Sequence, residues 1–114
     1  MGLNNLSEKT EATGIVKEVT VNYYVSDNSA YTYIITEAGY KILIDGVAPI
    51  EKGHSIRATG KVKSFGEFLR SRHPGWPQGK IANYLGTIHQ GSEESALEAR
   101  EITDATAGIT YIGF

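Results

Sequence analysis

Polar and apolar side chains alternate along most of the first ninety residues, and this period of two constrains the chain more than any other feature does. A helix would need apolar residues three and four positions apart, whereas alternation places them on one face of a strand. The first run changes phase after Lys17, which indicates a bulge within one long strand. The runs lie at residues 11–21, 30–37, 39–46, 51–65 and 80–89. The sequence therefore predicts an all-β domain of five strands, in which the second and third form a hairpin around Gly39.

A short internal repeat indicates how these strands are arranged. The stretch ATGIVK, residues 12–17, returns as ATGKVK at 58–63, with a glycine at the third position each time. Glycine is expected in mid-strand where a strand coils sharply and a side chain would crowd its neighbour. We therefore expect the two repeats to form adjacent walls of one small closed barrel.

The composition limits the classes of protein to which the chain can belong. Its 114 residues suit one domain that buries a core of its own. It has no cysteine, which excludes disulfides, thiolate catalysis and cysteine-based zinc sites. No stretch has the length or composition of a signal peptide or a membrane span. These features predict a soluble cytoplasmic protein without a membrane partner.

Charge is distributed unevenly along the chain. Residues 51–80 hold seven basic side chains and two acidic ones, whereas residues 1–50 hold three basic and six acidic. Residues 91–114 hold one basic side chain and five acidic ones. One basic stretch within an acidic protein points to a polyanionic partner.

The order of a long strand, a hairpin, a short connection, a coiled strand, a loop and a last strand resembles the OB-fold, a five-stranded Greek-key barrel. The stretch YTYIITEAGYKILIDGVAPIEKGHSIRATGKVK, residues 31–63, looks like the middle of OB domains of the archaeal replication protein A type. The resemblance covers about residues 10–89 and departs from that type at 47–52, where the usual helix is shortened. It implies a non-catalytic domain that binds single-stranded DNA, or RNA, in replication or repair.

The resemblance places a binding groove on the outer face of the second and third strands, where bases stack on aromatic rings and phosphates meet cations. Alternatively, Tyr31 and Tyr33 of these strands pack on each other or under the C-terminal tail. Trp76, the only tryptophan, lies between Pro74 and Pro77 and either stacks on a base or folds back over the barrel end. Lys61 and Lys63 either contact phosphates or simply form a solvated strand face. The candidate nucleic-acid-binding residues are Trp76, Arg70, Arg72, His73, Lys80, Tyr31, Tyr33, Lys41, Lys61 and Lys63.

The remaining expectations concern domain limits and the C-terminal segment. Residues 1–9 are expected to form an arm, 10–90 the OB-fold domain, and 91–114 an acidic helix or tail. The uncharged stretch GITYIGF, residues 108–114, also fits an extra strand at the barrel edge or in a second subunit. The alternative function is therefore a protein-interaction OB module that uses this tail for a partner or for self-association.

Catalysis is not expected, and neither is a metal or another cofactor. The three histidines, His54, His73 and His89, do not have the spacing of metal ligands. No serine lies in a nucleophile elbow, and no glycine-rich stretch has the form of a phosphate-binding loop.

Overall fold

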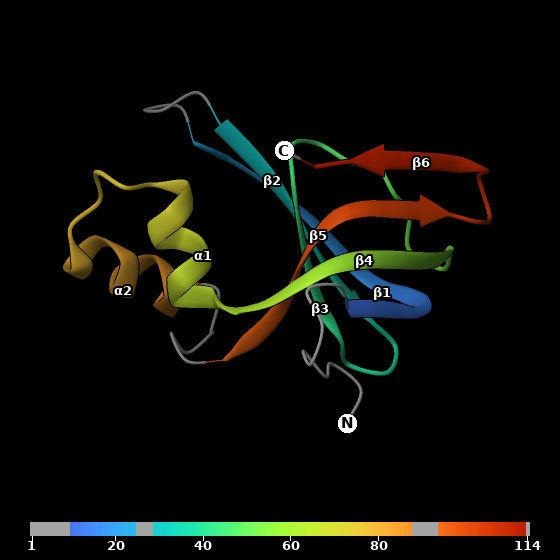
Figure 1. Ribbon diagram of the computed structural model, residues 1–114, viewed down its shortest axis with the longest axis horizontal. Coiled ribbons are helices and arrows are strands. Elements are labelled where there is room, and N and C mark those ends of the chain that lie inside the picture. The colour runs from blue at the N-terminus through green and yellow to red at the C-terminus, as the bar shows by residue number, and fades with distance from the viewer. Residues whose placement is uncertain (1–9, 25–28, 88–93, 114) are drawn as a thin grey trace.

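The computed structural model describes residues 10–24, 29–87 and 94–113, and strands that wrap around one core make up most of it (Figure 1). Two short helices project together from one end of these strands (Figure 1). The elements are β1 Thr10–Tyr24, β2 Ser29–Thr36, β3 Lys41–Asp45, β4 Ser55–Ser64, α1 Phe65–Arg72, α2 Gln78–Thr87, β5 Ser95–Asp104 and β6 Ile109–Ile112. Neither helix has the length and apolar character needed to cross a membrane.

Five strands close into a barrel. The sheet runs in the order β3-β2-β1-β4-β5-β6, and a parallel pairing of β3 with β5 closes the first five strands into a ring, outside which β6 lies. The long strand β1 belongs to two walls, because Thr10 to Ile15 pair with β4 and Val16 to Tyr24 pair with β2. The register shifts between Val16 and Glu18, so the bulge that the sequence indicates is present. This connectivity is compatible with the OB-fold, and the expected five-stranded Greek-key barrel is confirmed.

The barrel interior is filled by the inward members of the alternating pattern. Aliphatic side chains from all five strands are buried there, which explains why the hydrophobic periodicity is so regular. The largest buried members are Val16, Ile34, Ile42, Ile44, Ile56, Leu97 and Ile102. Ala48 and Ile50 of the β3–β4 connection complete the core. Residues 47–52 form no helix, so the shortened helix expected there is absent.

The repeated glycines lie where β1 and β4 run side by side, as the repeat predicts. Ala12 pairs with Ala58 and Gly14 with Ile56 in this antiparallel ladder. At Gly60 the opposite edge of β4 meets β5 at a register shift, and a Cβ there would overlap the backbone of Glu98. Glycine at this position therefore allows β4 and β5 to approach closely enough to close the barrel.

Residues 65–87 correct one expectation from the sequence. They form two helices rather than a loop followed by a strand, so the fifth strand expected at 80–89 is wrong. The Ser64 hydroxyl caps α1 by accepting a hydrogen bond from the amide of Glu67 at 3.1 Å. On α2, Ile81 and Leu85 are four residues apart and are both buried, as expected for the inner face of an amphipathic helix.

Residues 95–112 correct a second expectation. The segment predicted to be an acidic helix or tail contains the fifth barrel strand, β5, which pairs with β4, β3 and β6. The barrel therefore continues past residue 90. The last strand of the sheet, β6, lies outside the barrel and occupies most of the stretch that the sequence allowed as an extra strand.

Candidate nucleic-acid interface

The outer face of β2 and β3, where the sequence placed the binding groove, is covered by the helices. Tyr31 is 2 % exposed and Tyr33 is 8 % exposed, so neither ring is open to solvent where a base could stack on it. Tyr31 packs edge-on against Phe68 at 5.1 Å between centroids, and Tyr33 does the same against Phe65 at 5.6 Å. The Tyr31 hydroxyl also lies in hydrogen-bond contact with that of Tyr84 on α2. The structure thus gives both tyrosines the packing role.

These contacts belong to a second hydrophobic cluster outside the barrel. Its buried members come from β2, β3, β5 and both helices: Tyr31, Tyr33, Leu43, Phe65, Phe68, Leu69, Ile81, Leu85 and Ala96. Sequence reasoning missed the role of the phenylalanines and of α2 in this cluster. The signal was available in the spacing of Phe65, Phe68 and Leu69, which place one apolar face on a helix.

The Tyr33 hydroxyl has an unusual environment within this cluster. It is buried, and no hydrogen-bond partner faces it among the described residues. Burial, reinforced by the negative charges of Glu94 and Glu18, raises its pKa from 10.0 to about 12. The hydroxyl therefore stays protonated at physiological pH and adds a polar cost to an otherwise apolar interface.

Trp76 lies in the short connection between α1 and α2 and is half-buried. Its indole stacks on the buried ring of His73, with centroids 3.9 Å apart and planes 8° apart. The ammonium of Lys80 lies over the indole, 4.5 Å from its centroid. Because a stacked imidazole leaves no room for an ammonium on the same face, His73 and Lys80 must occupy opposite faces of the indole. The ring of Tyr84 also packs against the indole, with centroids 6.2 Å apart and planes 64° apart. Trp76 thus has the buried His73 on one face, the exposed Lys80 on the other and Tyr84 as a further aromatic neighbour.

Arg72, another residue expected to contact nucleic acid, holds α1 against the barrel. Its guanidinium pairs with Asp45 of β3 at 3.3 Å and with Glu98 of β5 at 3.5 Å. Glu98 also pairs with Lys63 of β4 at 2.7 Å. The guanidinium lies over the ring of Phe68, 5.1 Å from its centroid, which adds a cation–π contact. Two of the expected phosphate contacts, Arg72 and Lys63, are therefore engaged with carboxylates.

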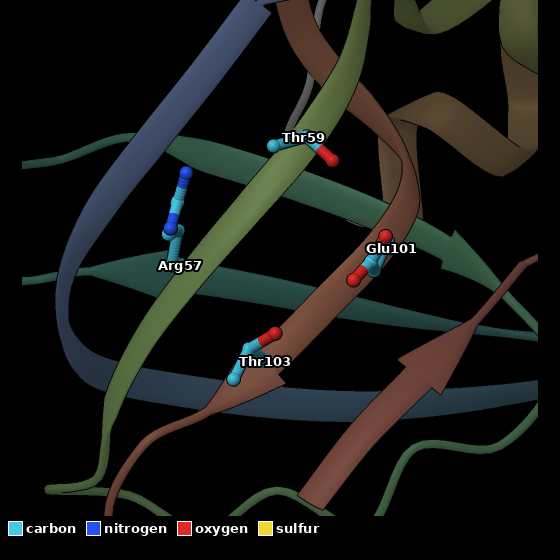
Figure 2. Close-up of a pocket in the computed structure, with 4 residues that line it drawn as sticks. All are labelled: Arg57, Thr59, Glu101 and Thr103. Carbon is cyan, nitrogen blue, oxygen red and sulfur yellow. The ribbon is translucent and has the colours of Figure 1, made fainter.

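Two further basic side chains of the strands are also paired with acids. Lys41 pairs with Glu94 at 2.8 Å, and Arg57 pairs with Glu11 of β1. Figure 2 shows Arg57 extending from β4 toward β1. Arg57 also lines a hollow of about 150 Å³ between β4 and β5. Its other lining residues, Thr59, Glu101 and Thr103, supply no cation. This strand face is therefore polar and close to neutral, and it does not form a track of positive charge.

Three of the predicted cations remain exposed with no carboxylate partner among the ion pairs of the described residues. They are Lys61 on β4, Arg70 on α1 and Lys80 on α2. Tyr23, near the end of β1, is 67 % exposed, the highest value among the large hydrophobic side chains of the described residues. Helices α1 and α2 with their short connection form a helical hairpin, residues 65–87. Of the predicted site, the structure brings together Trp76, His73 and Lys80 on this helical hairpin and leaves Arg70 and Lys61 open to solvent.

The comparisons with known proteins add no relative to this description. The chain matches no protein-family model, and it has no significant match among curated proteins or solved structures. In the part of the chain that the structure describes, no group of three or more His, Asp or Glu side chains could hold a metal ion.

Proposed function

We propose that the protein binds single-stranded nucleic acid, with DNA as the first candidate and RNA as the second, without catalysis, and with α1, α2 and their connection as the contact surface. The observation that carries the proposal is the stack of His73, Trp76 and Lys80, in which an exposed lysine ammonium lies over the indole. The OB-like barrel, a fold often used for oligonucleotides, supports the same proposal.

In this proposal a base takes the place of the Lys80 ammonium on the indole, and the ammonium moves to the adjacent phosphate. His73 remains on the opposite face and keeps the ring in a fixed orientation. The exchange is favourable, because base stacking on an aromatic ring contributes about 1–3 kcal/mol and an exposed cation–π contact only about 0.5–1 kcal/mol. In the same proposal, Arg70 of α1 and Lys61 of β4 are exposed cations that supply further phosphate contacts.

The fluorescence of Trp76 tests this directly, because no other residue of the chain contains an indole. Titration with a fluorescently silent oligo-dT at low salt is expected to quench the emission. Three exposed cations predict that the logarithm of the binding constant falls with the logarithm of salt concentration with a slope of about −2 for a single strand. Unchanged emission with an excess of oligo-dT at low salt would contradict the proposal and favour the protein-interaction module.

Variants separate stacking from charge. Trp76→Leu is expected to weaken binding about tenfold or more, and Lys80→Ala is expected to lower both the affinity and the salt slope. Lys52→Ala is the matched control, because Lys52 is an exposed lysine in the β3–β4 connection, away from α1 and α2. Equal losses for Lys80→Ala and Lys52→Ala would show attraction to overall charge rather than to this surface.

A further inference from the structure

The strand β6 ends the sheet and has one edge open. It pairs with β5 on one side, from Asp104 opposite Ile109 to Glu101 opposite Ile112, and no described strand lies on its other side. Ile109 is 46 % exposed and Ile112 is 56 % exposed. Residues 105–113 contain no charged side chain and no proline, which are the usual means of keeping an edge strand from pairing.

The register shows which backbone groups are available on this edge. The amide of Gly113 donates to the carbonyl of Arg100 at 2.8 Å, so the backbone of Gly113 faces β5. Because backbone groups alternate in direction along a strand, Tyr111 and Ile109 face β5 as well. Thr110 and Ile112 therefore present their N–H and C=O groups to the open side.

We propose that this edge joins two copies of the chain, with β6 pairing antiparallel to the β6 of the second copy around a two-fold axis at Tyr111. In that register Thr110 lies opposite the partner's Ile112, and each outward N–H meets an outward C=O. Tyr111 then faces the partner's Tyr111 as a pair without hydrogen bonds between the two residues. The two-fold axis generates every contact twice, as in other isologous dimers.

A second copy fits this edge better than a different partner for two reasons. The strand offers no charge that would select an oppositely charged peptide, whereas an uncharged strand matches itself without leaving any charge unpaired. The formal net charge of the chain is only −2, so repulsion between copies is small. The shared surface is short, so the dimer is expected to be weak and to form at about 10 μM to 1 mM. This inference does not depend on nucleic-acid binding.

Sedimentation velocity over that concentration range tests the proposal. The average mass of the unchanged chain is expected to rise toward that of a dimer. Thr110→Pro removes one outward N–H that the β5–β6 ladder does not use, and is expected to weaken the dimer at least about tenfold. Thr110→Ser is the matched control, because it keeps the backbone donor and the hydroxyl that contacts Thr103. A chain that stays monomeric throughout, or one whose dimer is equally strong with Thr110→Pro, would overturn the proposal.

Crosslinking tests the register, because the chain has no cysteine of its own. Paired residues without mutual hydrogen bonds have Cα atoms about 4.5 Å apart, within the range of a disulfide. Tyr111→Cys is therefore expected to form a disulfide-linked dimer on mild oxidation. In the same register Ile109→Cys places its sulfur more than about 10 Å from its counterpart and is expected to remain reduced. Equal crosslinking of both variants, with circular dichroism confirming that both are folded, would show random collision and refute this register.

Discussion

Replacing Gly60 with alanine should destabilise the barrel more than any other single-methyl change in its walls. The added Cβ would overlap the carbonyl oxygen of Glu98 and lie 2.8 Å from the Cα of Ala99. Both are backbone atoms, so no side chain can rotate away and β4 must separate from β5. Overpacking of a filled interior typically costs about 1–3 kcal/mol, and we expect the upper end of that range here.

Gly14→Ala provides a matched comparison within the same repeated sequence. Its Cβ would lie 3.3 Å from the Cβ of Thr36, a side-chain contact that shifts of a few tenths of an ångström relieve. The gain from a less flexible unfolded chain, about 0.4–1 kcal/mol, offsets much of that cost. We therefore expect the stability of Gly14→Ala to stay within about 0.5 kcal/mol of that of the unchanged protein.

Urea denaturation followed by far-ultraviolet circular dichroism measures both variants. With a slope of about 1.5 kcal/mol per molar urea, a loss of 3 kcal/mol lowers the midpoint by about 2 M. The midpoint of Gly14→Ala should move by less than about 0.3 M. A Gly60→Ala midpoint as close to the unchanged value as that of Gly14→Ala would refute the close approach of β4 and β5 on which the reasoning depends.

Three further substitutions test the electrostatics of the fold by the same urea assay. Tyr33→Phe removes a buried hydroxyl without a described partner and should stabilise the protein by about 1 kcal/mol. Between pH 10 and 12 the tyrosine of the unfolded chain ionises before the native one, which lowers the stability of the unchanged protein, and Tyr33→Phe should remove this part of the loss. Burial opposes the charged form of Asp104, but hydrogen bonds from His54 and from nearby backbone amides outweigh it and lower the pKa of this carboxyl below 3.8. The stabilisation by the Asp104 carboxylate is therefore complete above pH 3.8 and is lost as the pH falls through the lower native pKa. Asp104→Asn should consequently lose less stability in acid than the unchanged protein does. Arg72→Leu removes the cation that pairs with Asp45 and Glu98 and should lower the stability by about 1–2 kcal/mol. An unchanged urea midpoint would show that packing alone holds α1 against the barrel.

The first four strands could be predicted because β-branched and aromatic residues, which favour strands, are frequent in them, even on β2 and β3, where both faces are buried. On β4 only one face lies in the barrel, so alternation follows directly from burial in the run from Ile56 to Val62. The glycine at position 60 marked the point of closest approach for the same reason, since only a missing side chain permits it. The local sequence was therefore sufficient to predict a strand where the strand's own residue types and pattern already favour it.

The last barrel strand could not be predicted in this way. Ala96 packs in the cluster under the helices and Leu97 packs inside the barrel, so two consecutive side chains are buried on opposite faces. Such a strand loses its alternation, and its alanines and glutamates then favour a helix by propensity. On α2, Ile81 and Leu85 are four residues apart, a separation that fits both a helix and a strand.

The surroundings of some candidate site residues could not be predicted, for a related reason. The exposure of Tyr31 and Tyr33 depends on whether another segment covers β2, and their own sequence is the same in either case. Likewise, the pairing of Arg72 with Glu98 joins residues that are distant in sequence and meet only when the barrel closes. Exposed cations such as Lys80 were easier to identify, because their exposure requires no partner.

The parallel contact between β3 and β5 has a consequence for how the chain folds. Ile42 and Leu97 are opposite each other in that contact, so the barrel closes only through a loop of more than fifty residues. Pairings this distant in sequence slow the folding of small domains. During synthesis β1 to β4 emerge first, and until β5 follows they hold an apolar sheet with two open edges, at β3 and β4. The nascent chain is therefore most vulnerable to misassembly while residues 65–104 are still being made, and an early supply of β5 as a separate peptide should protect it.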